Sequence, residues 1–310
     1  NFANKIWNAS RFVMMNLTID SYALPETERM APEDKWVLSK LNTLVKEVTE
    51  NLDSYEIGVA SAKVYDFLWD TYCDWYIELT KTRLNGEDRE ASLTAQNVLC
   101  HVLVELMKLL HPFMPFITEE IFQALPGQTG SAREGEFLMT SRWPEYRAEL
   151  SFPAEEAAME AVMDTIKAIR ARRAEMNVPP SKKAEVLLVT ATPDIYAQGL
   201  HFIQRLAYAS RVTFADAAPA DTAGQVTVVT HNATAYLPLS ELVDVAEELA
   251  RIEKEIEKAR NGLRIVEQKL SNEKFVSRAP EAVVNVEREK AAKLQDLIAK
   301  LEESAKAMGG

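Results

Sequence analysis

An apolar seam near the C-terminal end of the sequence constrains its fold more than any other feature. Apolar residues recur there at alternating spacings of three and four, which is the heptad pattern of a coiled coil. A break at Ser271-Asn272, followed by Pro280, separates this helix from a second one with compatible spacing. The first seam holds Leu242, Val245, Leu249, Ile252, Ile256, Ala259, Leu263, Val266 and Leu270, and the second holds Val284, Ala291, Leu294, Ile298 and Leu301.

Two such helices around one break predict an antiparallel coiled-coil hairpin over residues 241–308. The alternative is that two chains dimerise through the first helix alone. The hairpin is favoured, because the second seam supplies a partner within the same chain.

The N-terminal half has helical periodicity almost throughout, with apolar positions recurring at spacings of three, four and seven. Asn85-Gly86, His111-Pro112 and Pro126-Gly127 are expected to end helices. The predicted helices cover residues 1–16, 33–53, 57–84, 92–110 and 115–124. Residues 1–150 are therefore predicted to form a helical bundle with a continuous core.

A small α+β unit is predicted for residues 151–240. It follows a connector at 127–153 that is rich in Gly, Ser and Pro. Helices are expected at 154–176 and 195–210, and strands at 184–189, 212–215, 226–229 and 235–239. The predicted fold class is thus mainly α, with a helical bundle, a small α+β unit and a C-terminal antiparallel coiled-coil hairpin.

Composition limits the function classes open to this chain. Of its 310 residues, 47% are apolar and 26% are charged, as in an ordinary globular protein, and its net charge is −12. That charge argues against a general nucleic-acid coater, but it allows an RNA binder with locally concentrated positive charge. There is no membrane-length apolar run and no secretory signal pattern. Cys73 and Cys100 lie in apolar helical patterns, so a reduced, cytoplasmic protein without a membrane partner is expected.

Patterns typical of catalysis are missing from the sequence. The four histidines are scattered, and no Gly-rich phosphate loop, nucleophile elbow or His-Glu-x-x-His pair occurs. The acidic residues Asp66, Asp70, Asp74 and Glu78 recur at intervals of four. A solvated helix face explains them better than a metal site, because ligands usually converge from several elements. We therefore predict no catalytic residue and no metal site.

The first helix combines an apolar face with a polar one. On a wheel of about 100° per residue, Lys5, Asn8 and Arg11 fall opposite the apolar arc, and Phe12 falls among them. An aromatic ring flanked by cations and amides suits unpaired RNA bases. On the pattern alone, packing of Phe12 under a neighbouring helix is the favoured alternative. The apolar arc, expected to face the core, holds Phe2, Ala3, Ile6, Trp7, Val13, Met14 and Leu17.

Two further segments concentrate positive charge. Residues 251–278 hold eight Lys or Arg residues against five Glu residues. Such clusters can neutralise phosphates, although an ordinary basic surface has the same composition. The other segment contains Lys167, Arg170, Arg172, Arg173, Lys182 and Lys183, with Glu175 as its one acid.

Five motifs resemble those of valyl-tRNA synthetases, which are class I aminoacyl-tRNA synthetases. They are NFANKIWNASRF at 1–12, CDWYIELTK at 73–81, HPFMPFITEE at 111–120, IR through RAEMNV at 169–178, and KLSNEKFVSRAPEAV at 269–283. The third is shared with the isoleucyl and leucyl enzymes. The last resembles the hairpin tip of the valyl enzymes' C-terminal coiled coil, which the other two families lack. The resemblance covers the whole chain in order.

The resemblance implies that the chain binds valine tRNA. Valine anticodons share a middle A and a third-position C. Phe12 would stack on the adenine, while Lys5, Asn8 and Arg11 would bind the cytosine edge and the adjacent backbone. The coiled coil would contact the outer corner of the tRNA. Candidate backbone contacts are Arg170, Arg172 and Arg173 in one helix and Arg260, Arg264, Lys269, Lys274 and Arg278 in the hairpin.

By the same resemblance, the parent enzyme uses ATP and Mg²⁺ to join valine to tRNA, and it hydrolyses mischarged threonyl-tRNA. The His-x-Gly-His and Lys-Met-Ser-Lys-Ser signatures of the class do not occur in this sequence. The chain is therefore expected to be a monomer that binds tRNA but not DNA, needs no cofactor and catalyses nothing alone. The alternative is a coiled-coil scaffold or dimerisation protein without RNA specificity.

Overall fold

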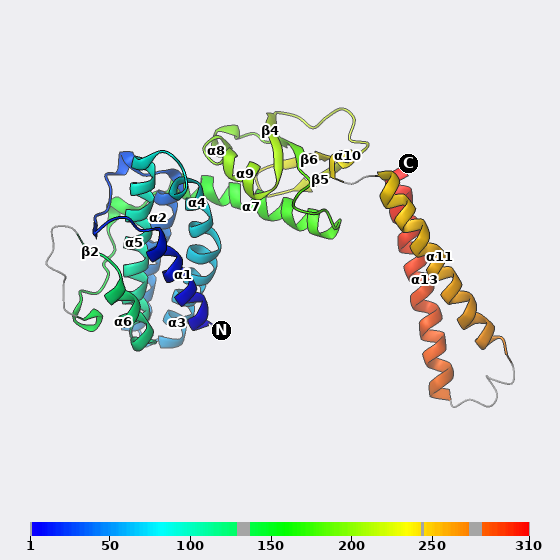
Figure 1. The fold of residues 1–310 in the computed structure, drawn as a ribbon, viewed down its shortest axis with the longest axis horizontal. Helices are drawn as coiled ribbons and strands as arrows, with labels where there is room; N and C mark the ends of the chain where they lie inside the picture. Colours follow the sequence, from blue (N-terminus) through cyan, green and yellow to red (C-terminus); the bar gives the residue numbers. More distant parts are fainter. Residues whose placement is uncertain (1, 129–136, 243–244, 273–280, 310) are drawn as a thin grey trace. The chain divides into compact units, whose positions relative to one another are not determined.

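The structure is a computed structural model that describes residues 2–128, 137–242, 245–272 and 281–309. It is mainly helical, with one small four-stranded sheet (Figure 1). The chain divides into two compact units. The first comprises Asn1–Asp164 and Thr192–Phe202, and the second comprises Thr165–Ala191 and Ile203–Gly310.

A helical bundle forms most of the first unit and confirms the predicted class. It contains α1 (Phe2–Asn16), α2 (Pro32–Asp53), α3 (Ile57–Asp66), α4 (Ile77–Leu84), α5 (Arg89–Leu110) and α6 (Pro115–Ala124), with a short η1 (Thr27–Arg29) before α2. Asp88 caps α5 by accepting hydrogen bonds from the backbone N–H groups of Glu90 and Ala91. Among the described residues, α5 is the one helix long and apolar enough to cross a membrane, yet 78% of that window is buried inside the protein.

The helix predicted over residues 57–84 is not one regular α-helix. Between α3 and α4 lies a π-helical stretch, η2 (Phe67–Tyr76), which has wider turns than an α-helix. Its buried side chains include Tyr72 and Tyr76. The hydroxyl of Tyr72 donates to the carbonyl of Leu99 at 2.9 Å, and that of Tyr76 donates to Asp34 at 2.6 Å. Both phenols thus have a partner inside the core, as buried polar groups require.

A buried ion cluster joins the start of α2 to the end of α4. Arg83 donates to both carboxylate oxygens of Asp34, at 2.7 and 2.5 Å, and its Nε lies 2.9 Å from Glu33. Asp34 also accepts a hydrogen bond from the backbone N–H of Ala31 at 3.1 Å. Burial raises the pKa of the Glu33 carboxyl to about 7, although Arg83 opposes that rise. One guanidinium therefore serves two buried carboxyl groups.

The described parts of the predicted connector at 127–153, residues 127–128 and 137–153, pack onto the bundle. It contains β2 (Gly127–Gln128), which pairs in parallel with β1 (Ser21–Tyr22), and the short helices η3 (Leu138–Thr140) and η4 (Ala148–Leu150). The side chain of Asn42 on α2 donates to the carbonyl of Arg147 at 2.7 Å and accepts from its N–H at 2.8 Å. These bonds satisfy connector backbone groups that would otherwise lack partners against α2.

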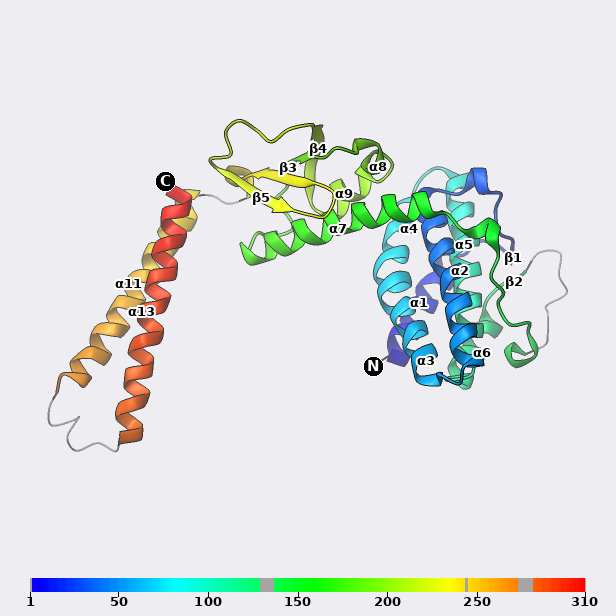
Figure 2. The same ribbon diagram turned by 180° about the vertical axis from the view of Figure 1, so that it is seen from behind.

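The sheet of the second unit has the strand order β4-β3-β6-β5. Figure 2 labels three of its strands, β3, β4 and β5. β3 pairs in parallel with β4 and antiparallel with β6, and β5 pairs antiparallel with β6. Side chains of β3 alternate between more and less buried positions, as in a strand with one covered face. The strands are β3 (Ala184–Val189), β4 (Ala209–Ala215), β5 (Gln225–Val229) and β6 (Thr234–Pro238), and the helix before them is α7 (Pro153–Glu175).

The prediction of one helix at 195–210 is wrong in part. That helix is replaced by α8 (Pro193–Ala197) and α9 (Leu200–Leu206), and its last two residues belong to β4. Gly199 lies between the two short helices, and a Cβ placed there would lie 2.5 Å from Cγ2 of Val162. The backbone at the break thus approaches α7 too closely for a side chain, and spacing along the sequence does not reveal this.

Substitution Gly199→Ala is expected to lower the free energy of unfolding by about 1–3 kcal/mol, the usual cost of overpacking. Val162 is fully buried and β-branched, so it has little freedom to move away. Urea unfolding measures the effect. The double variant with Val162→Ala should lose less than the sum of the two single variants, whereas additive losses would show that the two sites do not clash.

Two long helices, α11 (Val245–Leu270) and α13 (Glu281–Gly309), pack side by side (Figure 1). Arg260 pairs with Glu302, and Lys269 pairs with Glu287, so the helices run antiparallel. The prediction that Leu242 belongs to this seam is wrong. It ends the separate short helix α10 (Leu239–Leu242), where it is buried. The buried seam residues are Ile252, Ile256, Ala259, Val266 and Val284.

Candidate nucleic-acid interface

Helix α1 turns a narrower face to the core than its wheel predicts. Its fully buried residues are Ile6, Ser10 and Val13, and the helix contacts α5, α6 and η2. Trp7 was expected in the core, but it is 42% exposed. It is about 100° around the axis from Ile6, which places it outside the contact with the neighbouring helices.

Asn8 and Arg11 lie on the exposed side of α1, as predicted. Among the residues that the structure describes, neither side chain has a hydrogen bond or ion pair to another protein group. An amide and a guanidinium are directional donors, and the amide also accepts. These two side chains are therefore available to an external ligand.

Lys5 is more enclosed than its wheel position suggests. Its Nζ lies 2.7 Å from Oδ1 of Asp74 and 3.6 Å from the centroid of the Trp69 ring. Trp69 in turn stacks on Tyr65, and Tyr65 contacts Phe2 at a ring-centroid distance of 4.3 Å. Lys5 is thus held by a carboxylate and an aromatic face from η2.

Phe12 is half-buried. Its ring is therefore neither fully exposed, as base stacking would suggest, nor fully packed under a neighbouring helix. Nζ of Lys81 on α4 lies 5.6 Å from the centroid of its ring, within the range of a cation–π contact. Lys81 also pairs with Glu78, one turn earlier. Lys81 lies within the resembling motif at 73–81, but nothing in its spacing indicates that it meets the first helix.

Together α1, η2 and α4 form one surface, which we call the α1 face and define by Lys5, Asn8, Arg11, Phe12, Asp74, Glu78 and Lys81. It offers a ring in contact with a cation, two directional polar groups and two lysines that are each paired with an acid. These groups can stack on a base and bind its edge.

The arginines of α7 do not form one cationic surface. Arg173 is only 4% exposed, and it donates to the carbonyls of Pro179 and Lys182. Its guanidinium lies 5.4 Å from the Tyr208 ring. The expectation that Arg173 contacts tRNA is therefore wrong, because this side chain is buried in its own unit. Arg172 is exposed and pairs with Glu175 at 3.1 Å, while Arg170 is exposed.

The three hairpin candidates that the structure describes are exposed, and two of them are paired. Arg260 pairs with Glu302, and Lys269 lies 3.5 Å from Glu287. Arg264 is exposed. The other two candidates, Lys274 and Arg278, lie outside the described residues.

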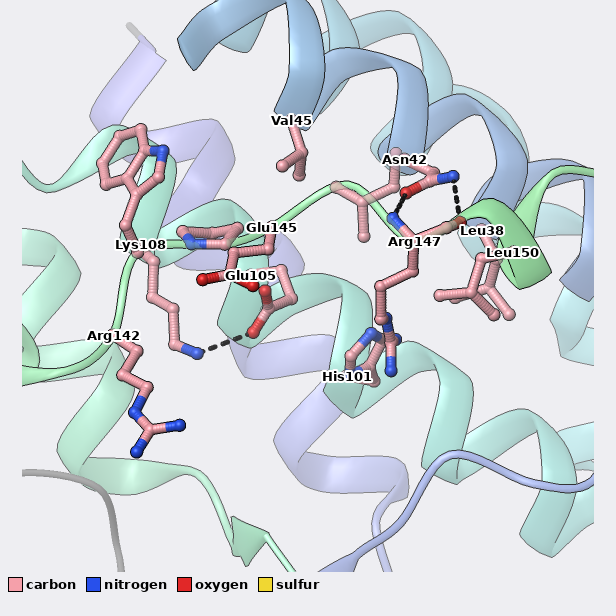
Figure 3. Close-up of a pocket in the computed structure, with 13 residues that line it drawn as sticks. Leu38, Asn42, Val45, His101, Glu105, Lys108, Arg142, Glu145, Arg147 and Leu150 are labelled. Atoms are coloured by element: carbon pink, nitrogen blue, oxygen red, sulfur yellow. Dashed lines mark hydrogen bonds and ion pairs between the residues drawn. The ribbon is translucent and has the colours of Figure 1, made fainter.

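A pocket of about 210 Å³ lies elsewhere in the first unit, between α2, α5 and the connector (Figure 3). Figure 3 shows Asn42 bonded to the backbone of Arg147 and Lys108 paired with Glu105 at 2.8 Å. Burial lowers the pKa of His101, which is 8% exposed, to about 4. This imidazole is therefore neutral at neutral pH.

The titratable groups of the described residues show no arrangement for metal or thiol chemistry. Across residues 2–128, 137–242, 245–272 and 281–309, no group of three or more His, Cys, Asp or Glu residues could hold a metal ion. Burial raises the pKa of both cysteine thiols, Cys73 and Cys100, to about 12. Both thiols are thus protonated and unreactive at neutral pH.

Comparison with known proteins gives the class and then the family. Residues 34–188 match the anticodon-binding domain of tRNA ligases, which agrees with the helical bundle and defines the class. Residues 244–309 match the tRNA-binding arm of valyl tRNA synthetase, which covers α11 and α13. The chain belongs to the valyl-tRNA synthetase family. Helix α1 precedes the first matched range, so its role is not covered by that match.

Individual relatives extend the similarity over α1. The valine–tRNA ligases of Clostridium acetobutylicum and Clostridium perfringens are 45% and 46% identical over 99% and 96% of this chain. That of Carboxydothermus hydrogenoformans is 44% identical over 94% of it. The chain spans about a third of the length of these relatives, namely 35%, 34% and 32%.

Proposed function

We propose that this chain is the tRNA-recognition region of a valine–tRNA ligase and binds valine tRNA. The observation that carries the proposal is the order of its parts: a bundle of the anticodon-binding class is followed by an antiparallel helical hairpin of the tRNA-arm class. The chain supports ATP-dependent joining of valine to tRNA in the cytoplasm, and it acts as a monomer.

In this proposal the chemistry of ATP and Mg²⁺ belongs to a catalytic region outside this sequence. The described residues offer no carboxylate group suited to Mg²⁺, and the sequence has no Gly-rich phosphate loop. These residues therefore fit the task of binding and orienting tRNA, and we assign them no step of the reaction.

The α1 face is proposed to read the anticodon. Phe12 stacks on the middle adenine, on the part of its ring that Lys81 leaves uncovered. Asn8 and Arg11 bind the edge of the third-position cytosine and the adjacent backbone, because their side chains are exposed and directional. Lys5 joins them by exchanging its contact with Asp74 for one with the RNA.

The hairpin is proposed to lie against the outer corner of the tRNA, where the D and T loops meet. Of the candidates in the described residues, Arg264 has the simplest route to a phosphate, because it is exposed and no described acid pairs with it. Arg260 and Lys269 must first release Glu302 and Glu287. Arg170 and Arg172 of α7 are proposed backbone contacts, whereas the buried Arg173 is not.

A binding measurement at two salt concentrations tests the proposal. It compares the affinity of the chain for valine tRNA with its affinity for a copy in which the middle anticodon A is changed. Weaker binding of the altered copy is expected at both. Equal binding of the two RNAs, with a steep dependence on salt, would mean that the chain holds tRNA by its backbone alone, and anticodon reading would be excluded.

Substitution Phe12→Ala is expected to weaken binding of valine tRNA by ~1–3 kcal/mol, the usual contribution of one base–aromatic stack. Titration of labelled tRNA measures the change, and thermal unfolding checks that the fold is kept. Trp7→Ala is the matched control, since Trp7 is an exposed aromatic residue of the same helix, about 140° away around the axis. A large loss of melting temperature with unchanged affinity per folded molecule would assign Phe12 to the core instead.

A further inference from the structure

The two lysines of the α1 face are both neutralised by acids of one helical segment. Asp74, in η2, lies 2.7 Å from Nζ of Lys5, and Glu78, at the start of α4, pairs with Lys81. The Lys5 pair joins residues that are 69 positions apart in the sequence. The acids at 74 and 78 are therefore more than a solvated face, since the structure places each against a cation of the proposed binding surface.

The pairing divides the cations of the α1 face by their chemistry. A lysine ammonium is a point charge that attracts any phosphate, whereas a guanidinium and an amide offer hydrogen bonds in fixed directions. Each lysine forms an ion pair with a carboxylate, while the side chains of Asn8 and Arg11 have no partner among the described protein groups. The groups that can distinguish bases are thus available to RNA. The ammonium groups, which bind any phosphate, have their charge neutralised by carboxylates.

That division affects specificity, because phosphate contacts contribute to affinity equally for every RNA sequence. A paired lysine must give up its carboxylate before it gains a phosphate, so its net contribution is small. The fraction of the binding energy that depends on base identity then rises.

We propose that Asp74 and Glu78 are specificity-determining residues, which neutralise Lys5 and Lys81 so that RNAs with the wrong anticodon are not retained through their phosphates. This inference rests on the proposed anticodon-reading function and deepens it. The same helical segment supplies a comparison within the molecule: Asp70 is also exposed, but it forms no ion pair with any described residue.

The test compares Asp74→Asn and Glu78→Gln with the control Asp70→Asn, each in the whole 310-residue chain. All three remove one negative charge and keep the size of the side chain. Affinity is measured for valine tRNA and for the copy with an altered middle anticodon base, at several salt concentrations. Thermal unfolding of each variant identifies any loss of fold.

Asp74→Asn and Glu78→Gln are each expected to raise affinity for the altered tRNA by about two- to fivefold, the range of an exposed ion pair. Affinity for valine tRNA should rise less, so the ratio between the two RNAs narrows. The salt dependence of binding should steepen by up to about 0.7–0.9 in log–log slope, as for one more phosphate contact. Asp70→Asn should leave the ratio unchanged.

Other outcomes overturn the inference in distinguishable ways. If the unaltered chain binds both RNAs equally, the proposed function fails and this inference fails with it. If the unaltered chain discriminates but the Asp74 and Glu78 variants keep its ratio, the inference alone fails. Weaker binding of valine tRNA by Asp74→Asn would also overturn it, because Asp74 would then be holding Lys5 in position for the RNA.

Discussion

Replacement of Arg83 by methionine is expected to lower the free energy of unfolding by about 3–5 kcal/mol, the usual loss when one partner is removed from a buried ion cluster. The guanidinium of Arg83 pairs with the carboxylates of Asp34 and Glu33. These two acidic residues are only 0% and 3% exposed. Without Arg83, two neighbouring carboxyl groups remain in the core with no cation. Urea unfolding at neutral pH measures the loss.

An exposed pair provides the control for this prediction. Arg29 lies 3.1 Å from Glu90, and both side chains are well exposed. Arg29→Met should therefore cost less than about 1 kcal/mol. Arg83→Lys should fall between the two variants, because it keeps the charge but loses the two-pronged contact with Asp34. A loss of less than about 1 kcal/mol for Arg83→Met would show that the carboxyl groups do not depend on this cation.

The second large effect is a dependence of stability on pH that originates at His101. Burial lowers the pKa of its imidazole from 6.5 to about 4 in the folded protein. Between these pH values the unfolded chain binds a proton that the folded protein does not accept. The contribution of His101 to the free energy of unfolding is thus fully present above pH 6.5, and it is lost as the pH falls towards 4. A shift of this size corresponds to about 3 kcal/mol.

Unfolding of His101→Gln at several pH values between 4 and 7 tests this prediction by difference from the unaltered protein. The gap between the two stability curves should change by about 3 kcal/mol over that range, and His231→Gln provides an exposed control. Glu33 acts in the opposite direction. Its raised pKa means that its contribution is present below pH 4.5 and is lost as the pH rises to about 7. A constant gap for His101→Gln would contradict the buried neutral imidazole.

The elements predicted best were those whose ends are written locally in the sequence. Helix α6 ends where Pro126-Gly127 predicts, and strand β3 has the predicted bounds of 184–189, which enclose a short, mainly apolar run. The π-helical turns of η2 were not predicted, because a wheel assumes about 100° per residue everywhere. Trp7 was placed in the core for another reason: the apolar arc assigned to the core was wider than the face of α1 that neighbouring helices cover.

For the candidate site, sequence motifs indicated α1 as the candidate helix but not its surroundings. Asn8 and Arg11 are exposed as predicted. The partners of Lys5 and Phe12 come from η2 and α4, almost 70 residues away in the chain, so only the tertiary structure brings them together. Arg173 shows the reverse error. A charge count treats every arginine as a surface cation, whereas this one satisfies carbonyl groups inside its own unit.

The bonds between Asn42 and Arg147 also set a time for the assembly of the bundle in the cell. These residues are 105 positions apart, and Ser39 likewise meets Phe152 across 113 positions. At the usual ribosomal rate of about 5–20 residues per second, α2 emerges roughly 5–20 s before the segment that completes it. Until then the part of α2 that the connector covers lacks its partner, although α3 and α5, which also pack on α2, emerge earlier. That part of the nascent bundle is therefore exposed to chaperones and proteases during the interval.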